Sequence, residues 1–236
     1  MAAPYLDNPC NWEVITLEAD SANEMIQSVD SGGTPSTTND ANWDGGIPWL
    51  TPKEITRNDE TLFVSHTERT ISEEGLATSA AKLLRPETVM LTKRAPVGAV
   101  AINSVPMTTN QGFLTFRCGN QLRPLYLAHW LRGNTRYLQQ VANGSTYREL
   151  YKTDLFEFQL AVPSIDEQDA ILSAISALQY VSLLGVAVEQ SVRDVDAMLS
   201  LQAQSLRLAT IRKSLLLQLL SGHLSVSDVD DWFGEK

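Results

Sequence analysis

The stretch "PSIDEQDAIL", residues 163–172, separates two parts of the chain that differ in composition. All ten prolines of the 236-residue sequence lie at or before Pro163. Beyond it the sequence holds three of its thirteen glycines, Gly185, Gly222 and Gly234. Proline inside a helix removes a backbone hydrogen bond and clashes with the preceding turn. We therefore predict a loop-rich first part over residues 1–163 and a helical second part.

The same stretch carries the signals of a helix start. Ser164 and Glu167 have the spacing of a capping box, in which the serine hydroxyl accepts from the glutamate N–H and the carboxylate accepts from the serine N–H. Asp166 and Asp169 place negative charge at the positive end of the helix dipole. These residues predict a helix that begins at Ser164.

Apolar residues then recur at spacings of three and four, which makes a stripe along one face of the helix. The residues of this dimer-helix stripe are Ile171, Ile175, Leu178, Val188, Val192, Val195 and Leu199. We predict a long helix over 164–223, stopped near Gly222, and a C-terminal tail over 224–236. A straight helix of this length reaches roughly 80–85 Å and cannot bury its stripe against itself. It either folds back near Gly185 or pairs with another chain as a coiled coil, and we expect the second.

The first part has the pattern of a mixed α/β domain, so the predicted fold class is α+β. Short apolar runs predict strands over 12–17, 88–93, 97–102, 112–117 and 156–162. Thr51-Pro52-Lys53-Glu54 has a second capping-box spacing, with proline at the first helical position. Residues 124–134 and 135–144 have the pattern of two short amphipathic helices.

Charge is distributed unevenly along the chain. The formal net charge is −10, which by itself disfavours binding to nucleic acid. Residues 1–60 hold 2 basic and 11 acidic side chains, whereas residues 82–152 hold 10 basic and 2 acidic ones. One third of an anionic chain is therefore cationic, with a net charge of +8. This segment either faces a polyanion or is an ordinary solvated surface.

The sequence lacks the motifs of several kinds of active site. "SGGTPSTTND", residues 31–40, holds two glycines and five hydroxyl side chains but not the lysine of a P-loop. There is no G-x-G-x-x-G, and "NPCN", residues 8–11, lacks the second proline and the aromatic residue of amino-methyltransferases. His66, His129 and His223 have no neighbours at zinc-ligand spacing. We therefore expect a binding protein with no catalytic residue, no metal and no cofactor.

Cysteine content and hydropathy indicate the compartment. Cys10 and Cys118 are the two cysteines, which argues against a disulfide framework and for a reducing environment. No run of eighteen apolar residues occurs, and "MAAPYLDNPCNWE" has no basic segment followed by an apolar one. We expect a cytoplasmic protein with neither a membrane span nor a signal peptide.

Taken together, these motifs resemble the DNA-specificity (S) subunits of type I restriction–modification systems. The stretches that carry the resemblance are, in order, "NWEVITLEADSANEMIQSVDSGGTPSTTNDANWDGGIPWLTPKEI", "ISEEGLATSAAKLL", "VMLTKRAPVGAVAINSVPMTTNQGF", "NGSTYRELYKTDLFEFQLAVPSIDEQDAIL" and "IRKSLLLQLLSGHLSV". The resemblance implies a DNA target-recognition domain followed by a long helix. It also implies partners: double-stranded DNA, methyltransferase (M) subunits and, in some assemblies, a restriction (R) subunit. The S subunit itself performs no chemistry.

The chain departs from the family in holding one such unit instead of two. It therefore resembles a half-size S subunit, and the helix stripe would pair with a second copy or with another half-size chain. Such a dimer would read an interrupted site, palindromic if the two copies are identical. The alternatives are an inactive remnant of a specificity subunit, an acidic DNA mimic that inhibits an enzyme, and a coiled-coil scaffold.

Loop position and side-chain type select the candidate DNA contacts. They are Thr34, Lys53, Arg57, Lys93, Arg94, Asn110, Gln111, Arg117, Ser145, Thr146, Tyr147 and Arg148. Several lie in stretches shared broadly by the resemblance and are therefore better suited to structural or phosphate contacts. We expect the base-reading residues in less familiar stretches, such as 57–69 or 120–137. The loop 31–40 is expected to be mainly structural.

Overall fold

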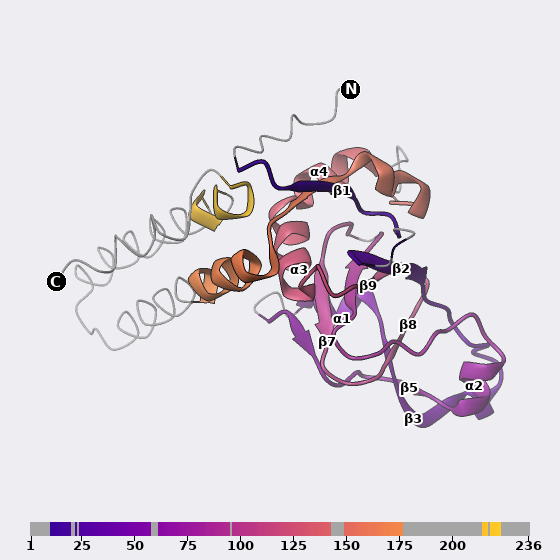
Figure 1. Cartoon of the computed structure of the whole chain (residues 1–236). Helices are drawn as coiled ribbons and strands as arrows, with labels where there is room; N and C mark the ends of the chain where they lie inside the picture. The colour runs from indigo at the N-terminus through magenta and orange to yellow at the C-terminus, as the bar shows by residue number, and fades with distance from the viewer. Residues whose placement is uncertain are drawn as a thin grey trace, which may run out of the picture. The chain divides into compact units, whose positions relative to one another are not determined.

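The computed structural model describes residues 10–19, 22, 24–57, 61–94, 96–142, 149–176, 214–216 and 218–222. The chain divides into two compact units (Figure 1). The larger unit is Val14–Leu160, and the other combines Met1–Glu13 with Ala161–Lys236.

A five-stranded sheet forms the centre of the larger unit. Its spatial order is β2 (Ile26–Ser31), β9 (Phe113–Cys118), β6 (Val89–Thr92), β7 (Val100–Asn103) and β4 (Phe63–Val64). β4 runs parallel to β7, and the other neighbours are antiparallel. Every residue of β6 and β7 is buried. Such burial is typical of strands that are covered on both faces, which explains their nearly continuous apolar sequences.

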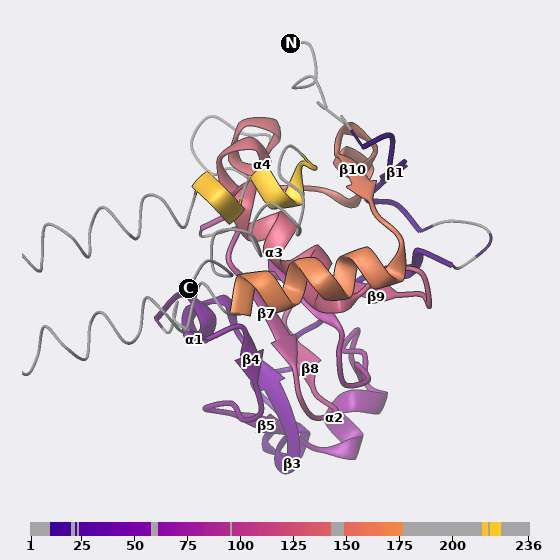
Figure 2. The ribbon, with the colours of Figure 1, turned by 60° about the vertical axis from the view of Figure 1, so that its left-hand side comes forward.

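A three-stranded sheet lies at one end of the larger unit, where both ribbon views place β3, β5 and α2 together (Figures 1 and 2). Its order is β5 (Thr70–Ile71), β3 (Trp43–Leu50) and β8 (Thr108–Thr109). The 3-10 helix η1 (Asp40–Asn42) precedes β3, and α2 (Glu73–Ala77) follows β5. The pairing of β3 with β5 shifts register between Trp43 and Ile47, which is the mark of a β-bulge.

Helices cover the central sheet. α3 (Pro124–Gly133) packs against β6 and β7, and residues 126–131 within it are all buried. α4 (Thr135–Val141) follows directly and packs on α3. α1 (Pro52–Arg57) begins as predicted, because the Glu54 carboxylate accepts from the Thr51 N–H at 2.8 Å. A 3-10 helix, η2 (Lys152–Glu157), precedes the last strand.

The main apolar core joins the elements of both sheets. Leu50 of β3, Met90 of β6 and Phe113 of β9 are fully buried in one cluster, with Ile55 of α1 beside them. A smaller cluster of Trp49, Ile71 and Ala81 lies in the three-stranded region. Burial of a large apolar side chain stabilises a fold by about 1.5–3 kcal/mol, so the first cluster is a major source of the unit's stability.

The chain passes from one unit to the other within a two-stranded sheet, and a capped helix follows. β1 (Glu13–Thr16) pairs with β10 (Gln159–Val162), and the boundary between the units crosses both strands. The capping box is confirmed: the Glu167 carboxylate accepts from the Ser164 N–H at 3.0 Å, and the Ser164 hydroxyl accepts from the Glu167 N–H at 3.4 Å. Residues 165–176 are helical, and Ile171 and Ile175 are buried. The other stripe residues, Leu178, Val188, Val192, Val195 and Leu199, lie outside the described residues.

The last described turn lies beside the first described residues. Residues 214–216 and 218–220 are helical, and Gly222 follows with φ of +72°. This left-handed residue confirms the predicted helix stop at Gly222. The Cys10 thiol donates to the Gly222 carbonyl at 3.1 Å, and a Cβ on Gly222 would lie 3.2 Å from the Trp12 ring.

Cys10 comes three residues before β1, and β1 pairs with β10, which ends two residues before Ser164. The fold-back and the pairing predicted for residues 164–223 both concern residues 177–213, which lie outside the described residues.

The predicted strands and helices of the first part are confirmed as β1, β6, β7, β9, β10, α1, α3 and α4. The sequence did not predict β2, β3, β4, β5, β8 or α2. In the part of the chain that the structure describes, no helix combines the length and the apolar character needed to cross a bilayer.

Candidate nucleic-acid interface

The loop 31–40 is tied to the 108–112 segment. The Gly33 N–H donates to the Thr109 carbonyl at 2.9 Å, and a Cβ on Gly32 would lie 2.1 Å from that oxygen. Only glycine permits this approach. The exposed Thr34 hydroxyl donates to the Gln111 side-chain carbonyl at 2.5 Å. The structure thus brings two candidate DNA contacts, Thr34 and Gln111, together as hydrogen-bond partners.

Two further candidates have structural partners. The Asn110 side-chain carbonyl accepts from the Gly112 N–H at 2.8 Å, which closes a tight turn. The Lys93 ammonium pairs with the Glu149 carboxylate at 3.1 Å, and 16% of the Lys93 side chain is exposed. Both residues thus have a structural partner, and their contacts with DNA stay predictions.

Three cationic candidates keep their side chains available. Lys53 on α1 and Arg117 on β9 are exposed, and Arg94, two residues after β6, is half-buried. Within the described ranges, none of the three side chains makes a hydrogen bond or an ion pair. Arg57 ends α1, and its side chain lies outside the description. Ser145, Thr146, Tyr147 and Arg148 also lie outside the described residues.

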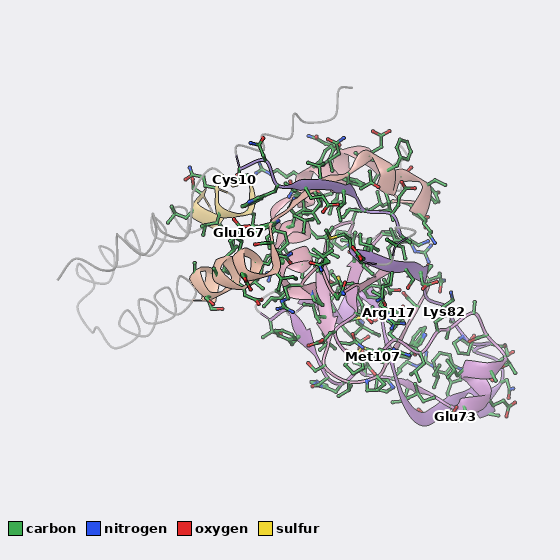
Figure 3. All side chains as sticks on the ribbon, viewed as in Figure 1. Cys10, Glu73, Lys82, Met107, Arg117 and Glu167 are labelled. Atoms are coloured by element: carbon green, nitrogen blue, oxygen red, sulfur yellow. The ribbon has the colours of Figure 1, made fainter. Side chains whose placement is uncertain are left out.

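Arg117 lies close to a second basic residue. It pairs in register with Ser28, while Asp30, two residues along β2, forms an ion pair with Lys82. Figure 3 shows Lys82 and Arg117 in the same region of the larger unit. Burial acts to raise the pKa of Asp30, but the hydrogen bond and charge of Lys82 outweigh it, so the pKa lies below its usual value. Asp30 is therefore ionised at neutral pH and neutralises Lys82, which leaves Arg117 as the unpaired charge at this position.

The cationic segment also lines a cavity of about 340 Å³. Its walls include Arg132, Thr135 and Gln139 from α3 and α4, residues 96–99 of the loop before β7, and Val100 at the start of β7. The Gln139 side-chain amide donates to the Val97 carbonyl at 2.9 Å, which fixes that loop.

The described histidines do not come together. His129 is buried on α3, whereas His66 is exposed and lies 63 positions earlier in the sequence. Among the residues described, no cluster of histidine, cysteine, aspartate and glutamate could hold a metal ion.

An aromatic platform under Arg69 was not predicted. Trp43 and Trp49 of β3 pack edge to face, and the Arg69 guanidinium lies over the Trp43 ring. Arg69 ends one of the stretches, 57–69, in which base readers were expected. Its contact with an indole twenty-six positions earlier could not be predicted from sequence, because that contact depends on the pairing of β3 with β5.

Comparison with known proteins identifies what the chain is similar to. A family model described as the type I restriction modification DNA specificity domain matches residues 9–184. The type I restriction enzyme MjaIX specificity subunit of Methanocaldococcus jannaschii is 35% identical over 170 residues, which cover 71% of this chain and 38% of that protein.

Two solved structures have the same fold. A chain from a structure on complex assembly and conformational transition of the type I R-M system matches with a TM-score of 0.60 at 20% identity, over 94% of this chain and 48% of the other. The HsdS subunit from Thermoanaerobacter tengcongensis matches with a TM-score of 0.56 at 18% identity, over 94% of this chain and 47% of the other. The chain thus spans less than half the length of each of these proteins.

Proposed function

We propose that this chain, which belongs to the type I restriction modification DNA specificity family, is a sequence-specific DNA-binding subunit. In this role it performs no chemistry itself. It directs a partner adenine methyltransferase to the DNA sequence that it reads, and a restriction subunit joins the complex where the system has one. The family match over residues 9–184 is the observation that carries this proposal.

The described surface supports a role in DNA binding. The exposed side chains of Lys53 and Arg117, and the half-buried Arg94, have no acidic partner within the described residues. Such cations are suited to phosphate contacts, which fix the register of a protein on a duplex. An acidic DNA mimic is less well supported, because it would be acidic along its whole length, whereas residues 82–152 carry a net +8.

Pairing of two units is the second part of the proposal. The chain covers 48% and 47% of the two solved chains, so two copies would together match the length of one such protein. Residues 164–223 would form the helix that pairs with a second copy or with another half-size chain, and 1–163 the recognition domain. Two recognition domains held apart by helices would read an interrupted site.

Co-expression with a type I methyltransferase subunit tests the function. A tagged chain is expected to retain the methyltransferase through purification, and DNA from these cells is expected to carry methyladenine at one interrupted sequence. The control is the same methyltransferase expressed without this chain, which should leave that sequence unmodified. A chain that neither retains the methyltransferase nor changes the methylation pattern would contradict the proposal.

A further inference from the structure

Arg69 lies flat on an indole in the three-stranded region of the larger unit. Its guanidinium carbon is 3.5 Å from the centroid of the Trp43 ring and 5.6 Å from that of Trp49. The two indoles pack edge to face, with centroids 5.1 Å apart and planes at 86°. Stacking on an aromatic face holds an arginine in place while leaving the N–H groups at its edge accessible.

The indoles are themselves anchored by the loop 31–40. The Trp49 indole N–H donates to the Gly33 carbonyl at 2.9 Å, and the Trp43 indole N–H donates to the Ser36 carbonyl at 3.1 Å. A Cβ on Gly33 would lie 2.4 Å from the carbonyl carbon of Ala80, so the loop is packed closely from its other side. This loop therefore supports the platform on which Arg69 lies.

The backbone of Arg69 is fixed as well. Its carbonyl accepts from the Trp49 N–H at 3.0 Å and from the Thr67 hydroxyl at 2.6 Å. Arg69 is exposed, and within the described part of the chain its guanidinium has neither a hydrogen bond nor an ion pair. An arginine that is ordered before binding loses little conformational entropy when a ligand binds to it.

The charges around Arg69 indicate which part of a duplex it contacts. From the start of η1 to the end of α2, residues 40–77, the sequence holds eight acidic and three basic residues. A segment with this net negative charge disfavours phosphate, whereas a base edge carries no net charge. The arginine fork donates two parallel hydrogen bonds to O6 and N7 of guanine, which is the commonest specific contact in the major groove.

We propose that Arg69, stacked on Trp43, reads a guanine in the DNA target through its major-groove edge. The inference rests on the proposed DNA-binding function and adds to it a specificity-determining residue. The phosphate contacts come from cations of the segment 82–152, such as Arg94 and Arg117. If the stacked Arg69 served only to stabilise the fold, replacing it would not change which DNA sequence the protein prefers. The structural role and the base-reading role can therefore be told apart by experiment.

Selection from a duplex library with a random central sequence tests the proposal. The full chain is compared with Arg69→Lys, which keeps the charge but loses the bidentate fork. Arg85→Lys is the matched control, because Arg85 is also exposed and its side chain has no partner in the described ranges. Thermal unfolding of all three proteins shows whether the substitutions leave the fold unchanged.

The wild-type chain and Arg85→Lys are expected to select one sequence that contains guanine, and Arg69→Lys to lose the preference at that guanine by on the order of tenfold or more while keeping the others. An unchanged preference in Arg69→Lys, or a selected sequence without guanine, would overturn the inference. Evenly weaker binding of Arg69→Lys to every duplex would reveal a phosphate contact and would also overturn it. If the wild-type chain selects no sequence, the proposed function itself is contradicted.

Discussion

His129 shows how burial sets the properties of a single residue in this protein. It lies within α3 and is 5% exposed. Burial, and secondly the positive charge of Arg132, lower the pKa of His129 from 6.5 to about 4. Its imidazole is therefore neutral at physiological pH and carries no positive charge.

This residue makes the stability of the fold depend on pH. Between pH 6.5 and 4 the unfolded chain protonates His129 but the folded chain does not, so acid favours unfolding. The free energy of unfolding of the wild-type protein is expected to fall between pH 7.5 and pH 4.5. In His129→Gln we expect this fall to be about 2–3 kcal/mol smaller. Urea unfolding at the two pH values measures this difference. The exposed His66, replaced by Gln, is the control, and equal pH dependence in wild type and His129→Gln would contradict the assignment.

The polar candidate residues show what sequence can and cannot indicate at this scale. Thr34, Asn110 and Gln111 were predicted as DNA contacts because loop hydroxyls and amides suit that role, but each has a partner within the fold. A sequence reports the type of a side chain and not whether another segment satisfies it. The loop 31–40 was expected to be mainly structural, and Gly33 and Thr34 do have partners in the 108–112 segment.

Among the elements, β3 shows why glycine and proline can mislead. Its sequence "WDGGIPWL" suggests a turn, yet Trp43–Leu50 is a strand. A Cβ on Gly45 would lie 2.2 Å from the Ser72 Cα, so the strand approaches its neighbour closely at that point. Gly46 has φ of +87° and nothing within 4 Å of its missing Cβ. The two glycines are therefore required for different reasons.

This difference predicts unequal effects of alanine at adjacent positions. Gly45→Ala forces a backbone shift against Ser72 and is expected to lower the free energy of unfolding by about 3 kcal/mol. Gly46→Ala has open space and is strained only by its left-handed backbone, so about 1 kcal/mol is expected. Urea unfolding of the two variants measures both values. A larger loss of unfolding free energy for Gly46→Ala than for Gly45→Ala would show that the close approach to Ser72 is not what requires glycine in this strand.

Elements with local signals were predictable, and elements defined by distant pairing were not. β6, β7 and β9 are apolar runs, and the helix after Pro163 has its own cap, so each carries its signal within a few residues. β4, β5 and β8 have two residues each and exist only through partners far along the chain. The stacking of Arg69 on Trp43 was not predicted for the same reason, because it requires β3 to lie beside β5.

For the molecule as a whole, the contact between Cys10 and Gly222 joins two residues that are 212 positions apart in the sequence and belong to the same unit. The proposed pairing of two copies can take two forms. Each copy either keeps this contact within its own chain, or exchanges it so that Gly222 of one copy reaches Cys10 of the other.

A disulfide at this contact distinguishes the two arrangements. A Cβ on Gly222 would lie 3.2 Å from the Cys10 sulfur, near the separation of about 3 Å that the two atoms have across a disulfide. Burial raises the pKa of the Cys118 thiol to about 12, so that thiol does not compete. Because Cys10 and Gly222 are in contact within one chain, oxidised Gly222→Cys is expected to run on a non-reducing gel with the mass of one chain and ahead of its reduced form, while the unsubstituted chain, which has Cys10 alone, shows no such shift. A cross-linked product with the mass of two chains would contradict this expectation, because it would show that two copies exchange the contact.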